Sequence, residues 1–411
     1  MTQPDPVQAF ERAFAGRVGQ PHAVSVTYAR LGLRLLLDSL SLRPDDEVII
    51  SALTCRVVVL AIQSVGVRPV YADLTSSGGL NIDAGSVAER LTPRTRAIVF
   101  QHTFGTNAGL EAVADLAMQR GIPLVEDCAQ CLPLGSHAPG ASAGARGIAS
   151  IWSHNFRKPM PVGAGGSVAT PDEHLAALVR QARDRGPRRT ALEELRLQAT
   201  RSAYTALMRP ATYWPLWSLA RRLRRDDERK PLQQSIHDEV TRLPVRISPR
   251  QAEWGLRGLI DADRRVQHAD DLARLYDDAL RGLSSVGQVP GAVSSPLYYY
   301  PVLARDKNAL LEAARRRRLE LVAWPLTTPI YPVESSSGLE QCEYRPGSCP
   351  QAEQRAAALC GLPLDLMTTR RGAQELIDLI LELDNRTRPA TSVPVENPLA
   401  GVLPREDPHV R

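Results

Sequence analysis

Short apolar segments alternate with helical stretches between residues 47 and 170, and this alternation limits the fold more than any other feature of the sequence. Six segments have the length and composition of buried strands: EVIISA (47–52), RPVYADL (68–74), AIVFQHT (97–103), PLVEDCA (123–129), ASIWSH (149–154) and GSVAT (166–170). Apolar strands separated by helices favour a mostly parallel sheet covered on both faces. The sequence therefore predicts a three-layer α/β fold.

The chain has 411 residues, which suits two or three domains. A second region follows a basic stretch, with a long helix expected from Gln251 to Leu280 and then strands and helices of a smaller α/β domain. The expected parts are an N-terminal lead-in (1–24), a large cofactor-binding domain (25–186), a basic aromatic helical insertion (187–240), the long helix with the small domain (241–387) and a disordered Pro-rich tail (388–411).

Several classes of protein fit this sequence poorly. The N-terminal residues lack the apolar core of a secretory signal, and no apolar run reaches the roughly 18 residues of a membrane span. Six cysteines in such a chain point to reduced thiols in the cytoplasm. Cys128 and Cys131 have CxxC spacing, but one pair alone is a weak metal signal, so we predict no metal site.

A single lysine stands out between an expected strand and a Gly-rich run. Lys158 lies in IWSHNFRKPMPVGAGG, and Asp127 ends an earlier apolar strand. A lysine amine can bond to the aldehyde of pyridoxal phosphate, and a buried acid can keep its ring nitrogen protonated. Ligands of parallel sheets bind beyond the carboxyl ends of the strands, where Asp127 is expected. These two residues predict a pyridoxal phosphate site.

The motifs around this lysine resemble those of the DegT/DnrJ/StrS aminotransferases, which are fold-type-I pyridoxal phosphate enzymes. The resemblance is carried by EDCAQ (126–130), SHNFRK (153–158) and GAGG (163–166), with further similarity in PDDEVIISALT, FQHTFG, ISPRQAEWGLRGL and CPQAEQRAAALCGLPL. It covers about residues 25–385. The family implies a homodimer with active sites between the subunits.

The resemblance also implies a role for individual residues. Lys158 would carry the cofactor and then shuttle a proton, and Asp127 would pair with the ring nitrogen. Gln130 would lie beside the ring or its phenolate oxygen, while Ser153 would bind the phosphate. Asn155 also falls among the cofactor-binding positions.

Other positions depart from the family pattern. The phosphate loop reads Tyr28-Ala29-Arg30, so Arg30 replaces the usual threonine, and a guanidinium beside Ala29 at a helix N-terminus can bind phosphate differently. Cys55 stands where an aromatic residue often stacks on the ring, and Ala164 replaces a glutamate. Arg246 replaces the asparagine that the partner subunit contributes, and is a second expected phosphate ligand.

The insertion at 187–240 interleaves arginines with aromatic and aliphatic residues. Three interpretations remain open: a helical lid or dimer contact, a segment that touches anionic lipid or a lipid-linked substrate, and a clamp for a phosphorylated soluble substrate. No nucleic-acid-binding module is recognisable. Contact with lipid would place the protein at the inner face of the membrane.

Lys158 argues for transamination, because the dehydratase branch of the family has histidine at this position. The leading hypothesis is an aminotransferase that moves an amino group from glutamate or glutamine to a ketone, most simply a nucleotide-linked ketosugar in polysaccharide or specialised-metabolite biosynthesis. Cys55 and Arg30 favour a second reading, a pyridoxal phosphate enzyme with a non-sugar substrate. The third is a catalytically idle, membrane-associated relative.

Overall fold

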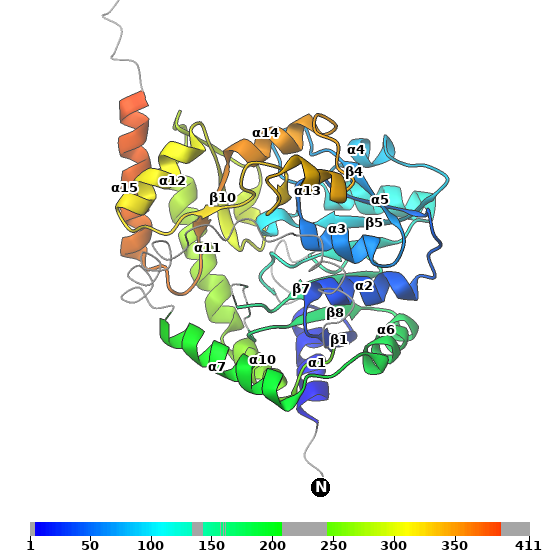
Figure 1. Cartoon of the computed structure of the whole chain (residues 1–411). Helices are drawn as coiled ribbons and strands as arrows, with labels where there is room; N and C mark the ends of the chain where they lie inside the picture. The colour runs from blue at the N-terminus through cyan, green and yellow to red at the C-terminus, as the bar shows by residue number, and fades with distance from the viewer. Residues whose placement is uncertain are drawn as a thin grey trace, which may run out of the picture.

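The computed structural model describes residues 5–133, 143–156, 158, 160, 162–207 and 245–387. A seven-stranded sheet of order β1-β8-β7-β6-β5-β2-β4 forms its centre (Figure 1). The strands are β1 (His22–Val26), β2 (Glu47–Ser51), β4 (Arg68–Ala72), β5 (Thr95–Gln101), β6 (Leu124–Asp127), β7 (Ala149–Ser153) and β8 (Gly166–Thr170). Only β8 runs antiparallel to its neighbours, so the predicted mostly parallel sheet is confirmed.

Helices cover this sheet on both faces because its strands are apolar on both sides. Along β2, Val48 and Ile50 pack in the cluster that includes two helices, α2 (Ala29–Ser39) and α3 (Arg56–Gln63). Ile49, between them, points the other way and packs with α4 (Ala84–Ala88) and α5 (Leu110–Arg120). The two faces of one strand thus belong to two separate apolar clusters, as a three-layer fold requires.

The N-terminal segment contains a helix and a strand. Helix α1 (Pro6–Arg17) begins at Asp5, whose side chain accepts a hydrogen bond from the N–H of Val7, and proline occupies its first position. Strand β1, which the sequence interpretation did not include, then joins the edge of the large sheet beside β8. Phe10 and Phe14 of α1 pack with Trp152 in a third apolar cluster.

The expected long helix over 251–280 is two helices. Helix α10 (Pro249–Ile260) starts with a capping box between Ser248 and Gln251, and α11 (Ala262–Ala279) follows. Asp261, with φ −89° and ψ 3°, leaves helical geometry and interrupts the hydrogen-bond ladder between them. Figure 1 shows α10 below the sheet and α11 rising beside the smaller domain.

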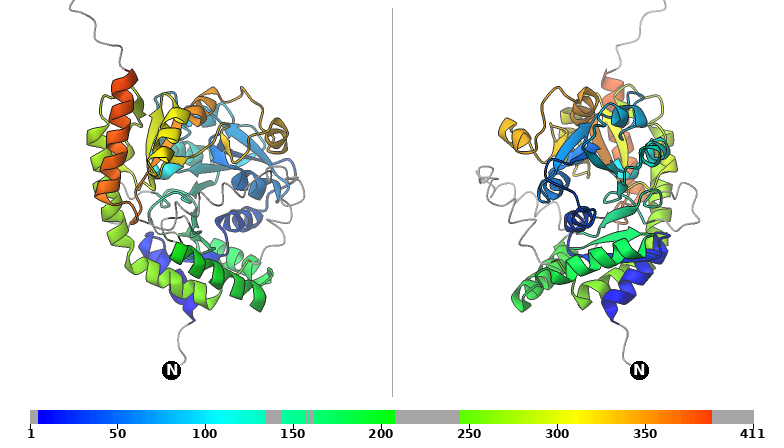
Figure 2. Two further views of the ribbon diagram at one scale, coloured as in Figure 1. Left: turned by 60° about the vertical axis from the view of Figure 1, so that its left-hand side comes forward. Right: turned by 90° about the vertical axis from the view of Figure 1, so that its right-hand side faces the viewer.

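The smaller domain contains a four-stranded antiparallel sheet of order β11-β13-β10-β9. Its strands are β9 (Val286–Gln288), β10 (Tyr299–Ala304), β11 (Val322–Ala323) and β13 (Leu359–Pro363). Its helices are α12 (Lys307–Arg316), α13 (Ser336–Gln341), α14 (Pro350–Ala358) and α15 (Arg370–Thr387). The two views of Figure 2 show α15 and α11 side by side, at the edge of the molecule away from α2 and α3.

A short parallel pairing connects the small domain to the large one. Strand β3 (Thr54–Cys55) pairs with β12 (Ile330–Tyr331), with Tyr331 opposite Cys55. Two 3₁₀ turns, η1 (Thr103–Gly105) and η3 (Ala292–Ser294), complete the described elements near this boundary. Residues separated by more than half the chain therefore meet beside the carboxyl ends of the central strands.

Two further helices flank the basic stretch. Helix α6 (Glu173–Arg185) begins at Asp172, and α7 (Ala191–Leu207) buries none of its residues. The rest of the predicted insertion and the predicted tail lie outside the described residues. Within the described part of the chain, no helix is both long and apolar enough to cross a membrane.

Candidate active site

The carboxyl end of β6 presents a buried acid. Asp127 is the last residue of this strand, and its Oδ1 accepts a hydrogen bond of 2.9 Å from the N–H of Ala129. Burial raises the pKa of Asp127, although that hydrogen bond and the charges of Lys158 and His102 oppose the rise. A carboxylate in this position would gain free energy from a cationic partner.

Lys158 lies close enough to Asp127 for each group to alter the pKa of the other. Removal of water lowers the pKa of Lys158, and the charges of Cys55 and Asp127 partly offset this. Its Nζ lies 5.7 Å from the centroid of the Tyr298 ring. A lysine with a lowered pKa is a better nucleophile near neutral pH, because more of its amine is unprotonated.

Two further groups face the same space. Burial raises the pKa of the Cys55 thiol, while the N–H of Val57 and the charges of Lys158 and Arg30 lower it. Arg30 stacks on Tyr28 at 4.3 Å, and its buried Nε has no hydrogen-bond partner among the described residues. A buried guanidinium N–H without a partner is costly, so this atom fits an anionic ligand.

The start of helix α2 lies against the glycine run. A Cβ on Gly166 would come within 2.5 Å of the backbone nitrogen of Ala29, so only glycine allows this approach. Ser153 ends β7 and pairs with Gly166, whereas Asn155 bridges Gly163. Ser153, Ala29 and Arg30 are thus brought together at a helix N-terminus, a favourable place for phosphate.

The side chain of Gln130 is partly occupied by a hydrogen bond to the protein backbone. Its Oε1 accepts a hydrogen bond of 2.7 Å from the N–H of Phe104, so only its amide nitrogen and its face remain for a ligand. Asn155 is exposed, and its Oδ1 accepts from the N–H of Phe156. Tyr298 and Phe104 received no role from the sequence, since no spacing links them to Lys158.

Within one chain, Arg246 contacts the end of α6. Its Nε is 3.5 Å from Asp184 at the end of α6, and the carbonyl of the preceding Val245 accepts from the N–H of Thr27. Among the described residues, the ion pair of Arg246 is thus with Asp184 and not with a group around Lys158. Its predicted role requires a neighbouring subunit.

A buried ion pair between His102 and Glu126 lies near Asp127. His102 Nε2 and Glu126 Oε2 are 2.9 Å apart and fully buried. Burial opposes the charged imidazole, but Cys131 and Glu126 raise the pKa of His102 to about 9. Glu126 also accepts the N–H groups of Gly144, Arg146 and Gly147. Burial raises the pKa of Glu126, but the hydrogen bond and charge of His102, and then the N–H groups of Gly147 and Gly144, keep it low.

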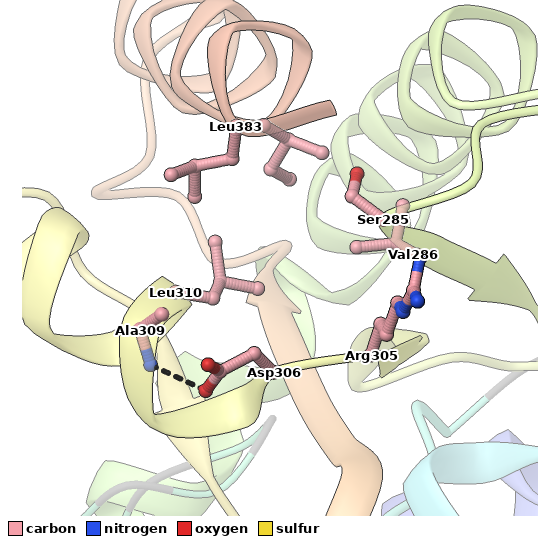
Figure 3. A pocket seen from close by; sticks show the side chains of 8 residues that line it. Ser285, Val286, Arg305, Asp306, Ala309, Leu310 and Leu383 are labelled. Atoms are coloured by element: carbon pink, nitrogen blue, oxygen red, sulfur yellow. Dashed lines mark hydrogen bonds between the residues drawn. The ribbon is translucent and has the colours of Figure 1, made fainter. Parts of the chain in front are cut away.

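A cavity of about 370 Å³ lies elsewhere, in the small domain (Figure 3). Leu310 and Leu383 face it, and Asp306 beside it caps α12 by accepting from the N–H of Ala309. Its lining contains none of the residues around Lys158. Because the hydrogen bond of Asp306 caps a helix, we do not regard this cavity as the active site.

The residues around Lys158 fit pyridoxal phosphate on the chemistry of their donor groups. They include an amine with a lowered pKa, a carboxylate whose charge burial disfavours, and an arginine nitrogen that has no hydrogen-bond partner in the described part of the chain. This fold with this site defines the class of pyridoxal-phosphate-dependent transferases with a three-layer α/β domain.

Residues 1–208 match the DegT/DnrJ/EryC1/StrS aminotransferase family. The chain belongs to this family and is a pyridoxal-phosphate-dependent aminotransferase. The dTDP-3-amino-3,4,6-trideoxy-alpha-D-glucose transaminase of Micromonospora megalomicea subsp. nigra is 29% identical over 359 residues, 87% of this chain and 84% of the relative. The GDP-perosamine synthase of Caulobacter vibrioides is 30% identical over 177 residues, 43% of this chain and 47% of that protein.

Solved structures show the same fold. The structure of S. venezuelae DesV in complex with a ketimine intermediate superposes with a TM-score of 0.73 at 24% identity, covering 93% of this chain and 90% of that one. NtdA from Bacillus subtilis with bound cofactor PMP gives 0.71 at 16% identity, covering 93% and 78%.

Proposed function

We propose that this aminotransferase moves an amino group from glutamate or glutamine to the ketone of a nucleotide-linked sugar. The product would enter cell-surface polysaccharide or specialised-metabolite biosynthesis. The relatives named for a dTDP-linked amino sugar and for GDP-perosamine support this substrate class. The observation that carries the proposal is that the Lys158 amine and the Asp127 carboxylate lie close enough for each to shift the pKa of the other.

The bound cofactor supplies an aldehyde that accepts the amino group and a ring that withdraws electrons. In this proposal Lys158 Nζ holds the cofactor and then moves a proton to and from the substrate carbon. Asp127 keeps a proton on the ring nitrogen. Arg30, Ala29 and Ser153 bind the phosphate at the N-terminus of α2.

The remaining residues have supporting roles in the proposal. Gln130 lies beside the ring and faces it with its amide nitrogen. Cys55 borders the ring where other family members often have an aromatic residue. Asn155 lies next to the glycine run. Arg246 reaches the phosphate of the neighbouring subunit in a homodimer. Light scattering of the purified chain tests this last point, because a monomer that is fully active would exclude it.

The first experiment locates the cofactor. The chain contains only three lysines, Lys158, Lys230 and Lys307. Reduction of the loaded protein with borohydride followed by peptide mass spectrometry should place the adduct on Lys158. An adduct on either other lysine, or none at all, contradicts the assignment.

The second experiment identifies the substrates. Glutamate should remove the visible absorption band of the loaded protein and release 2-oxoglutarate. A panel of nucleotide ketosugars should then restore the band and give an amino sugar detectable by mass spectrometry. Turnover of simple keto acids or aldehydes without turnover of any sugar would favour the non-sugar alternative, which Cys55 and Arg30 suggest.

We also propose that the protein acts in the cytoplasm and that the 187–240 region touches the inner face of the membrane. The described part of this region, α7, exposes Leu192 (56%) and Leu195 (62%) beside basic residues. Co-sedimentation with anionic vesicles should depend on residues 187–240. Equal binding of the full chain and a chain lacking these residues would rule out this contact.

A further inference from the structure

The turn after Asp127 carries two cysteines that the proposed reaction does not use. The N–H of Cys131 donates to the carbonyl of Cys128 at 3.0 Å, with Ala129 and Gln130 at the centre of the turn. Such a β-turn keeps its end Cα atoms within about 7 Å, and disulfides span Cα separations of about 4.4–6.8 Å. Burial, and then the neighbouring Cys131, raise the pKa of the Cys128 thiol.

The turn is fixed at both ends by backbone contacts. The N–H of Cys128 donates to the carbonyl of Ile151 in β7, at 2.9 Å. Cys131 bridges Leu297, and Leu132 donates to Pro296. The two side chains are 1% and 2% exposed.

A metal ion is a competing occupant. One ligand atom each from His102, Glu126 and Cys128 lies within 4.8 Å of the others. However, the Glu126 oxygens already accept hydrogen bonds from His102 and from three backbone N–H groups. Because a metal would have to break these contacts, the geometry favours a thiol pair.

We propose that Cys128 and Cys131 form a reversible disulfide, which makes the turn behind the cofactor pocket a site of oxidation by peroxide. The thiolate of one cysteine attacks an oxygen of hydrogen peroxide, the O–O bond breaks and hydroxide leaves as water after protonation. The second thiol then attacks the resulting sulfenic sulfur, the S–S bond forms and a second water leaves. The two thiols lose two electrons, and the peroxide gains them.

The disulfide would act on the cofactor site through short contacts. Ala129 inside the loop donates its N–H to Asp127, and Gln130 accepts from Phe104. Leu297, opposite Cys131, directly precedes Tyr298, whose ring lies near the Lys158 amine. Closing the loop changes the positions of these groups, so oxidation should weaken pyridoxal phosphate binding severalfold, and reduction should restore it.

The test uses the full chain, with and without pyridoxal phosphate. After treatment with hydrogen peroxide, the protein is denatured, free thiols are blocked with N-ethylmaleimide and the protein is digested with trypsin. Residues 121–146 form one tryptic peptide that holds these two cysteines and none of the other four. The expected peptide is unblocked and lighter by two hydrogen atoms, and dithiothreitol before blocking abolishes it.

Cysteine variants and a measurement of pyridoxal phosphate affinity complete the test. The link should persist in Cys360→Ala, a buried cysteine of the small domain, and vanish in Cys128→Ala and Cys131→Ala. If both thiols of wild-type peptide 121–146 remain available to N-ethylmaleimide under peroxide that forms the disulfide of a CxxC reference peptide, the proposal is wrong. An unchanged affinity for pyridoxal phosphate in the linked protein would refute its effect on the site. The mass readout is independent of aminotransferase activity.

Discussion

The side-chain oxygen of Gln130 accepts a hydrogen bond of 2.7 Å from the backbone N–H of Phe104. Phe104 is a non-glycine residue with φ 54°, in the left-handed region that costs free energy for L-residues. Its carbonyl accepts from Tyr298, and its ring contacts Tyr299 and Trp324. The bond to Gln130 therefore holds a strained residue between the cofactor pocket and the small domain.

Replacing Gln130 with methionine, which has a similar shape but no strong acceptor, should lower the free energy of unfolding. We expect a loss of about 1–3 kcal/mol, because the buried N–H of Phe104 loses its partner. Urea unfolding of the cofactor-free protein measures this. Gln374→Met on the exposed face of α15 is the matched control and should change stability by about 0.5 kcal/mol or less. Equal losses in the two variants would contradict the role of this bond.

Lys158→Arg should retain a cation but lose transamination. An arginine cannot bond to the cofactor aldehyde or shuttle a proton near neutral pH, so we expect activity to fall by roughly 10²–10⁴-fold. Steady-state rates and the visible spectrum measure both effects. Arg371→Lys, at a side chain 89% exposed, should keep full activity. Substantial activity in Lys158→Arg would remove the basis of the assignment.

Asp127→Asn should shift the pH dependence of Lys158. Burial lowers the pKa of Lys158, and the charge of Asp127 partly restores it. Removing that charge lowers the pKa further, so the amine becomes neutral at a lower pH. Labelling of cofactor-free protein with pyridoxal phosphate and borohydride should therefore reach half its maximal rate at lower pH than in wild type.

The same substitution should reduce turnover by about 10²–10³-fold, as expected for loss of a charge aimed at the reacting group. A labelling profile that does not move would show that the two groups are not coupled. Normal turnover would exclude Asp127 as the partner of the ring nitrogen.

Lys307→Met should destabilise the small domain. The Lys307 ammonium donates to the carbonyls of Pro325, Leu326 and Ala356 at 2.6, 2.8 and 2.7 Å. Methionine leaves these acceptors without their donor, so we expect a loss of about 2–5 kcal/mol in unfolding free energy. The residues after Trp324 should gain hydrogen–deuterium exchange, and unchanged exchange there would contradict this role.

The sequence predicted the central layers well, because strand and helix patterns are local. Residues such as Val48, Ile49 and Ile50 are apolar in succession, which is typical of a strand covered on both faces, and β2 is such a strand. The interpretation missed β1 because this short strand gains its partner only from β8, far along the chain. It also merged α10 and α11, since the apolar spacing continues across Asp261.

The motifs around Lys158 and Asp127 identified the family and its cofactor from the sequence alone. The residues of each motif are close together in the chain, so their spacing can be recognised without a structure. Only the tertiary structure decided which distant groups the predicted site residues contact. Tyr298 reaches Lys158 from the small domain, Gln130 binds Phe104, and Arg246 pairs with Asp184. These contacts depend on how sheet and helices pack, and no local spacing specifies them.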